Sequence, residues 1–357
     1  MTQALRLAAR GMNTSHPNPR VGCVIANDGG IVGSGWHERA GGPHAEILAL
    51  ESAGGAARGA TVYVTLEPCS HHGRTPPCVA ALLEAGVGRV VIALPDPNPA
   101  VNGSGQRALE EAGIRVECGL MAEAAAELNA GFLMRMRSGR PWVRVKIAAS
   151  LDGRTALKNG SSRWISGESA RQDVQAWRAR SSAILTGIGT VLADNPALTA
   201  RVQEPPLRPL RVVADSRWRT PPGCRVLEDP ASCLIAGGED LPVPAGLLDS
   251  GSRCLAMPVS RGRLDLPALL HELAVLEINE LQVEAGAVLC GALLNARLVD
   301  EILLYQAPVL LGEGGPGLFS LGVLESMQDR TQLEVLETRS LGQDLRWRLR
   351  PQPADTE

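Results

Sequence analysis

The sequence is poor in lysine, in aromatic residues and in long apolar runs. Only two lysines, Lys146 and Lys158, occur among its 35 basic residues, and Phe, Trp and Tyr make up 3% of the 357 residues. The protein cores are therefore expected to consist of Leu, Val, Ile and Ala. The formal net charge of -3 gives no basic excess to neutralise a phosphate backbone, so no nucleic-acid partner is expected.

No apolar stretch approaches the roughly 18 residues that a membrane-spanning helix needs, so no membrane association is expected. The N-terminal residues 1–6 lack the charged leader and apolar run of a secretion signal. Eight cysteines in such a chain fit reduced thiols better than a disulfide framework. Together these absences predict a cytoplasmic protein.

A chain of 357 residues has room for two domains of roughly 150 residues each. The first half alternates strands and helices, with a hairpin at 21–36, strands at 61–66, 89–94 and 114–118, and helices starting near 45, 79 and 106. A longer helix at 121–137 is followed by Ser138-Gly139-Arg140-Pro141, which breaks the pattern. We place the domain boundary there, which gives domains at 1–140 and 141–357.

The second half restarts with a strand at 142–149 and alternates in the same way. Further strands are predicted at 183–186, 210–214, 233–236, 254–257, 281–284 and 301–311, helices at 169–180, 269–276 and 288–296, and a closing hairpin at 333–349. Both halves are therefore expected to be α/β domains, the first of them a sandwich with a largely parallel sheet.

The residue pattern that most specifically indicates a chemical function lies between residues 44 and 78. His44, Cys69 and Cys78 supply one imidazole and two thiols, which are suitable ligands for zinc. His44 and Cys78 stand at predicted helix N-termini, where the helix dipole favours the thiolate form that binds metal. Three protein ligands leave a fourth position for water, which is the arrangement of a catalytic zinc site.

Glu46 stands two residues after His44 and is the expected proton shuttle. Zinc lowers the pKa of its bound water to about 7, and a carboxylate can carry a proton from that water to a departing amine. His-x-Glu followed by Pro-Cys and a second cysteine marks zinc deaminases, but here eight residues separate the cysteines instead of two. The alternative is a structural zinc with His71 or His72 as its fourth ligand, in which Glu46 would have no role.

Four motifs of the first half make it resemble the deaminase domain of the bifunctional pyrimidine deaminase/reductase family of riboflavin biosynthesis. They are Asn18-Pro19-Arg20-Val21-Gly22, Gly35-Trp36-His37, the loop from Pro68 to Cys78, and Asp96-Pro97-Asn98-Pro99. The resemblance implies a cytidine-deaminase-like α/β/α sandwich that holds one zinc ion.

The same resemblance assigns residues to the substrate. Asn18 would hold the pyrimidine edge, with His37 nearby. His71 and Arg74 would contact the ribose phosphate, and Asp96 and Asn98 the sugar. The planar guanidinium group of arginine can donate two parallel hydrogen bonds to phosphate oxygens. The 96–99 segment, without the resemblance, would be predicted to be a plain turn.

The second half resembles the reductase domain of the same family, which is similar in fold to dihydrofolate reductase. The matching segments are 146–154, 164–166, 190–199, 283–286, 293–294 and 298–301. The resemblance implies NADPH as the hydride donor, in contact with Ala148, Trp164, Thr190, Asp194, Ser216, Gly286, Ala287, Val288, Leu289, Cys290, Gly291 and Ala292. The substrate would contact Ser162, Arg178, Leu198, Arg201 and Glu284, and the two arginines suit its phosphate.

Lys146 and Glu284 are the expected polar catalytic pair of the second half, with Asp194 in support. Lys146 lies in an otherwise apolar strand, and the alternative is that it points to a solvent-facing side of the sheet. Glu284 ends a strand that leads into Gly286 and a helix, where backbone N–H groups can surround a phosphate. Gly286 and Gly291 would permit close approach.

One further motif is expected to be without function. Residues 312–317 satisfy Gly-x-Gly-x-x-Gly, but the dinucleotide-binding motif needs a helix to begin there within a βαβ unit. The following residues are too short for this and contain Gly322, which favours a loop.

The resemblance predicts zinc-dependent deamination of a phosphoribosylamino pyrimidinone, followed by NADPH-dependent reduction of its ribosyl group to ribityl. The partner is then a small phosphoribosyl pyrimidine, and the family implies a homo-oligomer, either a dimer or a tetramer. Two other classes stay open: a deaminase that acts on nucleic acid, and a zinc-stabilised binding module whose second domain senses a nucleotide. An enzyme with only one surviving activity is not indicated, because neither half lacks an expected ligand.

Overall fold

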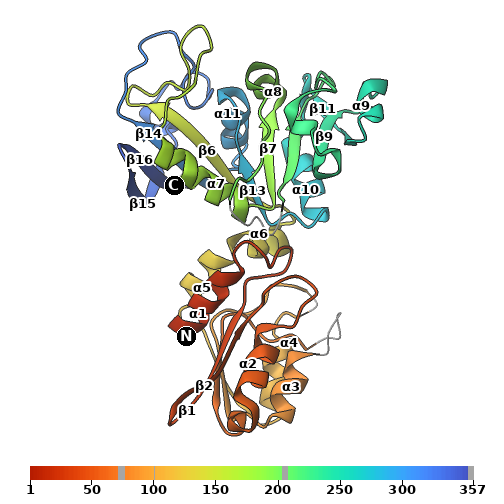
Figure 1. The fold of residues 1–357 in the computed structure, drawn as a ribbon, viewed down its shortest axis with the longest axis vertical. Helices are drawn as coiled ribbons and strands as arrows, with labels where there is room; N and C mark the ends of the chain where they lie inside the picture. The colour runs from red at the N-terminus through yellow and green to blue at the C-terminus, as the bar shows by residue number, and fades with distance from the viewer. Residues whose placement is uncertain (71–76, 100, 203–207, 353–357) are drawn as a thin grey trace. The chain divides into compact units, whose positions relative to one another are not determined.

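A computed structural model describes residues 1–70, 77–99, 101–202 and 208–352 of the chain. The chain divides into two units, Met1–Arg140 and Pro141–Glu357, each with its own sheet and core (Figure 1). Among the described residues, no helix combines the length and hydrophobicity that crossing a bilayer requires. His71 and Arg74, which were expected at the substrate, lie outside the described residues.

The first unit contains a five-stranded sheet in the order β2-β1-β3-β4-β5. Its strands are β1 (Gly22–Asn27), β2 (Gly30–Trp36), β3 (Thr61–Val64), β4 (Arg89–Ile92) and β5 (Arg115–Cys118). β1 is antiparallel to β2 and β3, whereas β3, β4 and β5 are parallel. The sheet is therefore mixed and not largely parallel, because the initial hairpin adds antiparallel strands at one edge.

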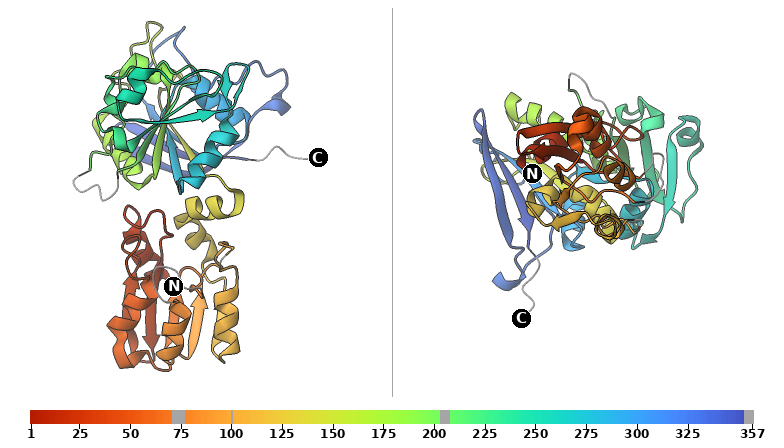
Figure 2. Two further views of the ribbon diagram at one scale, coloured as in Figure 1. Left: turned by 90° about the vertical axis from the view of Figure 1, so that its right-hand side faces the viewer. Right: turned by 90° about the horizontal axis from the view of Figure 1, so that it is seen from below.

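Helices cover both faces of this sheet, as the two views of Figure 2 show. The larger cluster of buried apolar residues joins one face to α2 (Ala45–Ala53), α3 (Cys78–Glu84) and α4 (Ser104–Glu111). Two smaller clusters involve α1 (Thr2–Ala8), α5 (Ala122–Leu128) and α6 (Ala130–Ser138). Short 3-10 turns, Ala9–Gly11 and Gly54–Ala57, follow α1 and α2. The predicted sandwich is confirmed, with a core of small aliphatic side chains.

The single helix predicted at 121–137 is two helices, because Asn129 interrupts it. Asn129 is buried, and its Oδ1 accepts a hydrogen bond from the backbone N–H of Arg20 at 2.8 Å. Its Nδ2 donates to the carbonyl of Arg20 at 2.9 Å. These two bonds satisfy polar groups that would otherwise be buried without partners. They also fix the segment before β1, which carries Asn18.

The second unit contains a nine-stranded sheet in the order β10-β9-β8-β7-β13-β6-β14-β16-β15. Its strands are β6 (Trp142–Ser150), β7 (Ala183–Gly187), β8 (Leu210–Ala214), β9 (Cys233–Gly238), β10 (Arg253–Met257), β13 (Glu280–Val283), β14 (Glu301–Ala307), β15 (Leu333–Leu341) and β16 (Asp344–Pro351). All pairs from β10 to β14 are parallel, and β16 and β15 are antiparallel additions. β14 ends before the predicted residue 311, because Pro308 cannot donate to a strand ladder.

Helices also cover both faces of this second sheet. α10 (Leu266–Val275) and α11 (Ala287–Asn295) pack on one face, and α7 (Glu168–Arg180), α8 (Ile188–Asp194) and α9 (Ala245–Asp249) on the other. A hairpin of β11 (Val259–Ser260) and β12 (Arg263–Leu264) and 3-10 turns at Arg225–Leu227, Pro230–Ser232 and Met327–Asp329 complete the unit. Residues 312–317 form a loop, as predicted. The sequence did not predict α8, α9 or the β11–β12 hairpin, which are too short to show a hydrophobic period.

Candidate active sites

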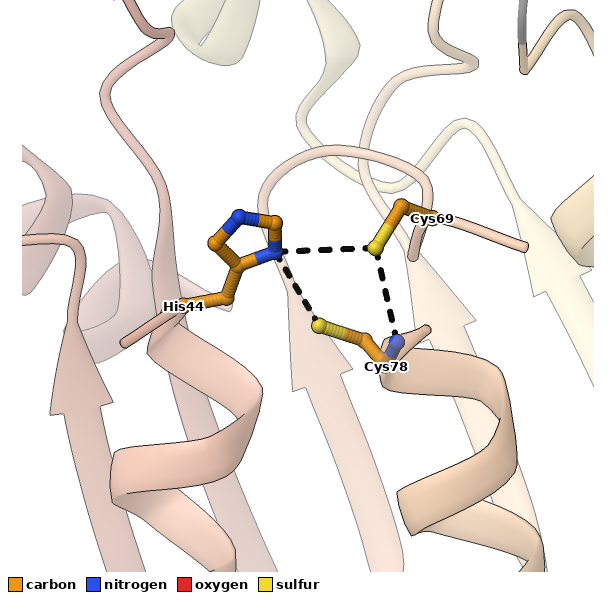
Figure 3. Close-up of side chains that lie close together, drawn as sticks. All are labelled: His44, Cys69 and Cys78. Atoms are coloured by element: carbon orange, nitrogen blue, oxygen red, sulfur yellow. Dashed lines mark hydrogen bonds between the residues drawn. The ribbon is translucent and has the colours of Figure 1, made fainter. Parts of the chain in front are cut away.

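The first candidate site lies where His44, Cys69 and Cys78 come together (Figure 3). His44 is the N-cap of α2, Cys78 is the first residue of α3, and Cys69 lies in the loop after β3. Nδ1 of His44 is 3.2 Å from Sγ of Cys78 and 3.6 Å from Sγ of Cys69, and the three ligand atoms all lie within 4.8 Å of one another. Ligand atoms of one tetrahedral zinc ion are about 3.5–3.8 Å apart. The three side chains therefore fit that ion.

Cys69 and Cys78 shift each other's pKa values in opposite directions. Hydrogen bonds from the thiol of Cys78 and from His44 lower the pKa of Cys69 to about 4 against the effect of burial. The backbone N–H of Cys78, at the start of α3, also donates to Sγ of Cys69 at 3.4 Å. The contact with Cys69, together with burial, raises the pKa of Cys78. A dication that binds both sulfurs would replace the proton of the Cys78 thiol.

Glu46 lies in the first turn of α2 and is buried beside the three ligands. α2 packs closely on β2 because Gly33 and Gly35 have no side chains: a Cβ at Gly35 would lie 2.6 Å from the carbonyl oxygen of Ala45. Burial raises the pKa of Glu46 to about 7, although the charge of His44 opposes this. A carboxyl with a pKa near neutrality can both accept and return a proton, as a shuttle must.

Asn18 and His37 form a hydrogen-bonded pair next to the zinc ligands. Nδ1 of His37 is 3.0 Å from the carbonyl oxygen of Pro43, and its Nε2 is 3.0 Å from Nδ2 of Asn18. Because a carbonyl can only accept, Nδ1 carries the proton and Nε2 accepts from the Asn18 amide. Burial lowers the pKa of His37 and so favours this neutral ring, which meets the ring of His44 edge-on at 5.5 Å.

Sequence reasoning missed Glu67, whose buried carboxylate joins three segments of this site. Its Oε2 accepts hydrogen bonds from the backbone N–H groups of Asp96 and Gly103, both at 3.1 Å. Its Oε1 accepts from those of Gly105 at 2.9 Å and Gln106 at 3.1 Å. The carboxylate thus lies at the N-terminus of α4, where the helix dipole favours negative charge. The sequence feature that could have indicated this role is the position of Glu67, an acid at the end of an apolar strand and directly before Pro68-Cys69.

Glu67 connects the loop of a zinc ligand to the loop predicted to bind the sugar. It precedes Cys69 by two residues, and it holds the backbone of Asp96. Oδ1 of Asp96 in turn accepts from the N–H of Asn98 at 2.8 Å, which makes 96–98 an Asx turn. The 96–99 segment is therefore a turn in its local geometry, and its role at the sugar stays a prediction.

The second candidate site lies at the carboxyl ends of β6 and β13. Glu284 follows β13 and accepts hydrogen bonds from Nε and Nη2 of Arg178 at 2.6 and 2.8 Å, and from Nε2 of Gln282 at 2.8 Å. Burial would raise the pKa of Glu284, but the charge and hydrogen bonds of Arg178, with a contribution from Lys146, hold it at about 2. Glu284 is therefore ionised at neutral pH.

Lys146 is half-buried on the face of β6 that α7 covers, and not on a solvent-facing side. Its Nζ is 5.8 Å from the centre of the Tyr305 ring. Burial lowers the pKa of Lys146. The positive charge of Arg178 lowers this pKa further, whereas the negative charge of Glu284 raises it. The predicted catalytic pair thus interacts through its charges, while the hydrogen bonds to the Glu284 carboxylate come from Arg178 and Gln282.

The residues expected to contact NADPH follow the carboxyl ends of adjacent parallel strands. Ala148 lies near the end of β6, Gly286 follows β13, Thr190 lies in α8 after β7, and Ser216 follows β8. Open α/β sheets bind their ligands at this edge. Trp164, in the loop before α7, is 71% exposed. Asp194 ends α8, and its carbonyl accepts from Nη2 of Arg163 at 2.6 Å.

Residues 287–292 belong to the first turns of α11 and not to a loop. The side chain of Cys290 is buried in the core, so it faces away from any ligand. A Cβ at Gly291 would lie 2.3 Å from the carbonyl oxygen of Ser320. This glycine therefore permits close packing of the chain on α11. Gly286, in contrast, is exposed with open space around it, as a phosphate would need.

The residues expected at the substrate of the second unit differ in exposure. Nη1 of Arg178 donates to the carbonyl of Thr199 at 3.0 Å, which leaves only its remaining N–H groups for a phosphate. Arg201 is exposed, and Ser162 is half-buried. Leu198 is only 3% exposed and packs in an apolar core cluster, so its backbone alone is available to a ligand.

Comparison with known proteins first gives the class of each unit. Residues 1–94 match the family model of the cytidine and deoxycytidylate deaminase zinc-binding region, and residues 141–346 match that of the RibD C-terminal domain. The chain thus joins a zinc-binding deaminase domain to a reductase domain.

Full-length relatives then identify the family. The chain is 50% identical to riboflavin biosynthesis protein RibD of Escherichia coli K12, over 97% of this chain and 96% of that protein. The solved structure of Acinetobacter baumannii RibD matches with a TM-score of 0.92 and 46% identity, covering 99% of this chain and 98% of that one. A Thermotoga maritima structure, described as a diaminohydroxyphosphoribosylaminopyrimidine deaminase/5-amino-6-(5-phosphoribosylamino)uracil reductase, matches with a TM-score of 0.87 and 34% identity, covering 99% and 97%. The chain belongs to the RibD family and is a bifunctional deaminase and reductase of riboflavin biosynthesis.

Glu67→Gln tests whether this residue positions the deaminase site. The amide turns one acceptor into a donor that would face backbone N–H groups, and losing a charged hydrogen bond costs about 1.5–3 kcal/mol. We expect kcat/KM for deamination to fall roughly tenfold or more, chiefly through KM, while bound zinc is retained. Steady-state ammonia release and zinc analysis measure this. Glu84→Gln, an exposed change at the end of α3, is the control. Parental KM and kcat in Glu67→Gln would contradict the assignment.

Proposed function

We propose that the first unit hydrolytically deaminates 2,5-diamino-6-(5-phosphoribosylamino)pyrimidin-4-one at a zinc site formed by His44, Cys69 and Cys78. The observation that carries this proposal is the convergence of three zinc ligands next to a buried glutamate whose pKa is raised to about 7. Zinc, when bound, supplies a water molecule that ionises near neutral pH. Glu46 is placed to take a proton from that water and to return it to the ring nitrogen and the departing amine.

Asn18 is the proposed anchor of the pyrimidine. Its Nδ2 donates to His37, so its Oδ1 is directed away from that ring and can accept from an N–H group of the substrate. Asp96 and Asn98, held through Glu67, are proposed at the sugar. His71 and Arg74 are proposed at the phosphate on the resemblance alone. A purely structural zinc would give no reason to bury Glu46, because burying a carboxyl is unfavourable.

Glu46→Gln should stop deamination without releasing zinc, because it removes the proton carrier and keeps the metal ligands. We expect ammonia release from the diaminopyrimidinone substrate to fall by roughly 10²–10⁴-fold. Glu51→Gln, an exposed change on the same helix, should leave the rate unchanged. Chelation of zinc should abolish ammonia release while NADPH oxidation with the deaminated compound persists. A zinc-loaded Glu46→Gln protein with the parental rate would show that the metal site is structural.

For the second unit, we propose reduction of the ribosyl group of the deaminated product to ribityl, giving 5-amino-6-(5-phosphoribitylamino)uracil. NADPH, when bound, supplies a hydride to C1'. Opening of the ribose ring leaves negative charge on the ring oxygen, which must receive a proton. Glu284 has no proton to give at neutral pH, because its pKa is about 2. The ammonium group of Lys146 can supply one, and its lowered pKa makes it a better acid, so we assign the proton transfer to Lys146.

Lys146→Ala tests this assignment, and the chain's other lysine supplies the control. We expect NADPH oxidation, followed near 340 nm with the deaminated substrate, to fall by roughly 10²–10⁴-fold, the usual contribution of a positioned general acid. Lys158→Ala, an exposed change, should keep the parental rate. Deamination should be unaffected in both variants. Unchanged turnover of Lys146→Ala would exclude Lys146 as the proton donor.

We also propose that the chain forms a homo-oligomer through its second unit. Large apolar side chains stay exposed along residues 309–335, among them Leu310 at 72%, Val323 at 91%, Met327 at 75% and Val335 at 55%. Val335 lies on β15, the last strand in the order of the sheet. Exposed apolar segments and sheet edges are ordinarily covered by a partner. Light scattering should give a multiple of the 37.6 kDa chain mass, and a monomer at assay concentrations would contradict the proposal.

A further inference from the structure

Two segments of the second unit that are far apart in sequence bring exposed arginines together. The loop after β8 packs against the β11–β12 hairpin: Oγ of Ser216 donates to the carbonyl of Gly262 at 3.1 Å. A Cβ at Gly262 would lie 3.9 Å from Nη2 of Arg217, so that guanidinium lies against the hairpin turn. The exposed arginines of the two segments are Arg217, Arg219, Arg261 and Arg263.

These arginines are not equally available to a ligand. Nε of Arg219 lies 4.0 Å from Oδ1 of Asp215. Asp215 is itself buried and accepts from the N–H and hydroxyl groups of Thr220 at 2.6 and 2.8 Å, so it cannot reach a ligand. Within the described ranges, no carboxylate forms an ion pair with Arg217 or Arg261. Two guanidinium groups are therefore free to bind an anion.

Arg261 occupies a backbone conformation that an arginine does not favour. It and Gly262 have φ angles of +51° and +71°, as a two-residue hairpin turn of the mirror-image type requires. Glycine, asparagine and aspartate are the usual residues there. A strained arginine at an exposed turn contributes little to folding, which points to a use for its side chain.

The position of this cluster suits one end of the dinucleotide that the second unit is proposed to bind. The residues expected to contact NADPH follow strands β6, β13, β7 and β8, which are neighbours in that order. Neighbouring strands are about 4.8 Å apart, so the ends of β6 and β8 are about 14 Å apart. Lys146, on β6, marks the nicotinamide end, which leaves the adenosine end of an extended dinucleotide beside Ser216.

On the basis of the proposed use of NADPH, we propose that Arg217 and Arg261 bind the 2'-phosphate of the adenosine ribose and so select NADPH over NADH. The planar guanidinium group offers two parallel N–H donors that match phosphate oxygens. Ser216 supports the pair by holding the hairpin turn beside the loop. The specificity is thus placed on two segments outside the catalytic pair.

Asp240 is the feature that argues for NADH. Its Oδ1 would lie 2.4 Å from a Cβ at Gly238, where the carbonyl oxygen of Ser216 would be at 2.8 Å, so its carboxylate lies near the same loop. A carboxylate beside the ribose accepts from the 2'-hydroxyl of NADH and repels a 2'-phosphate. The two unpaired guanidinium groups of Arg217 and Arg261 outnumber the one carboxylate of Asp240, so the net charge of the loop favours binding of the 2'-phosphate of NADPH.

Calorimetric titration of the full-length protein with NADP+ and with NAD+ tests this without any turnover. The parent should bind NADP+ more tightly than NAD+. Arg217→Ala and Arg261→Ala should each weaken NADP+ binding roughly 10- to 100-fold, the value of a charged hydrogen bond, and leave NAD+ binding within about twofold. Arg253→Ala is the matched control, because Arg253 is exposed at the opposite, amino end of β10. A parental circular dichroism spectrum and thermal unfolding curve of each full-length variant show that its second unit is folded.

The outcomes separate this inference from the proposed function. Equal weakening of NADP+ and NAD+ in Arg217→Ala, or an unchanged preference for NADP+ in both variants, overturns the phosphate assignment alone. Tighter binding of NAD+ by the parent overturns it in favour of Asp240. A parent that binds neither dinucleotide overturns the proposed use of NADPH and the inference with it.

Discussion

A carboxylate buried in protein must be satisfied by hydrogen bonds or by opposite charge, or it takes up a proton. Both sites of this chain depend on that constraint. Four backbone N–H groups satisfy Glu67, and one bidentate arginine satisfies Glu284 and holds its pKa at about 2. Burial raises the pKa of Glu46 to about 7, because it outweighs the charge of His44 and the hydrogen bonds that Glu46 makes with its own backbone and with Cys78. The partners therefore decide the protonation behaviour: Glu284 stays ionised, whereas Glu46 can take up and return a proton.

The sheets bring these acids to their partners. In the first unit, β3 and β4 are parallel, so the loops after their carboxyl ends meet, and they carry Cys69 and Asp96. In the second unit, β6 and β13 are parallel neighbours, which places Lys146 near Glu284. The glutamates lie just past strand ends, where a side chain can be buried and still reach donors from several segments. The catalytic groups are thus fixed by regular elements and not by long loops.

The sequence predicted what short-range patterns determine. The zinc ligands follow from residue types at helix N-termini, and α/β architecture follows from alternating strands and helices. It could not predict the role of Glu67, because its four donors lie between 29 and 39 residues away and are backbone groups without a residue signature. Asn129 interrupts a regular helical pattern, and its side chain instead binds the backbone of Arg20, which is 109 residues away in the sequence. The packing role of Gly291 could not be predicted for the same reason, since the chain that packs on it comes from another part of the sequence.

The scarcity of lysine makes the lysine of the second site informative about its role. Elsewhere in this unit buried cations are arginines: Arg144 is fully buried between Glu280 at 2.9 Å and Glu301 at 3.2 Å, and these acids raise its pKa although burial opposes this. Such a group stays charged and can only hold partners in place. Lysine differs, because desolvation readily lowers its pKa and lets it release a proton. Burial lowers the pKa of Lys146, and a lysine with a lowered pKa suits a general acid at this position.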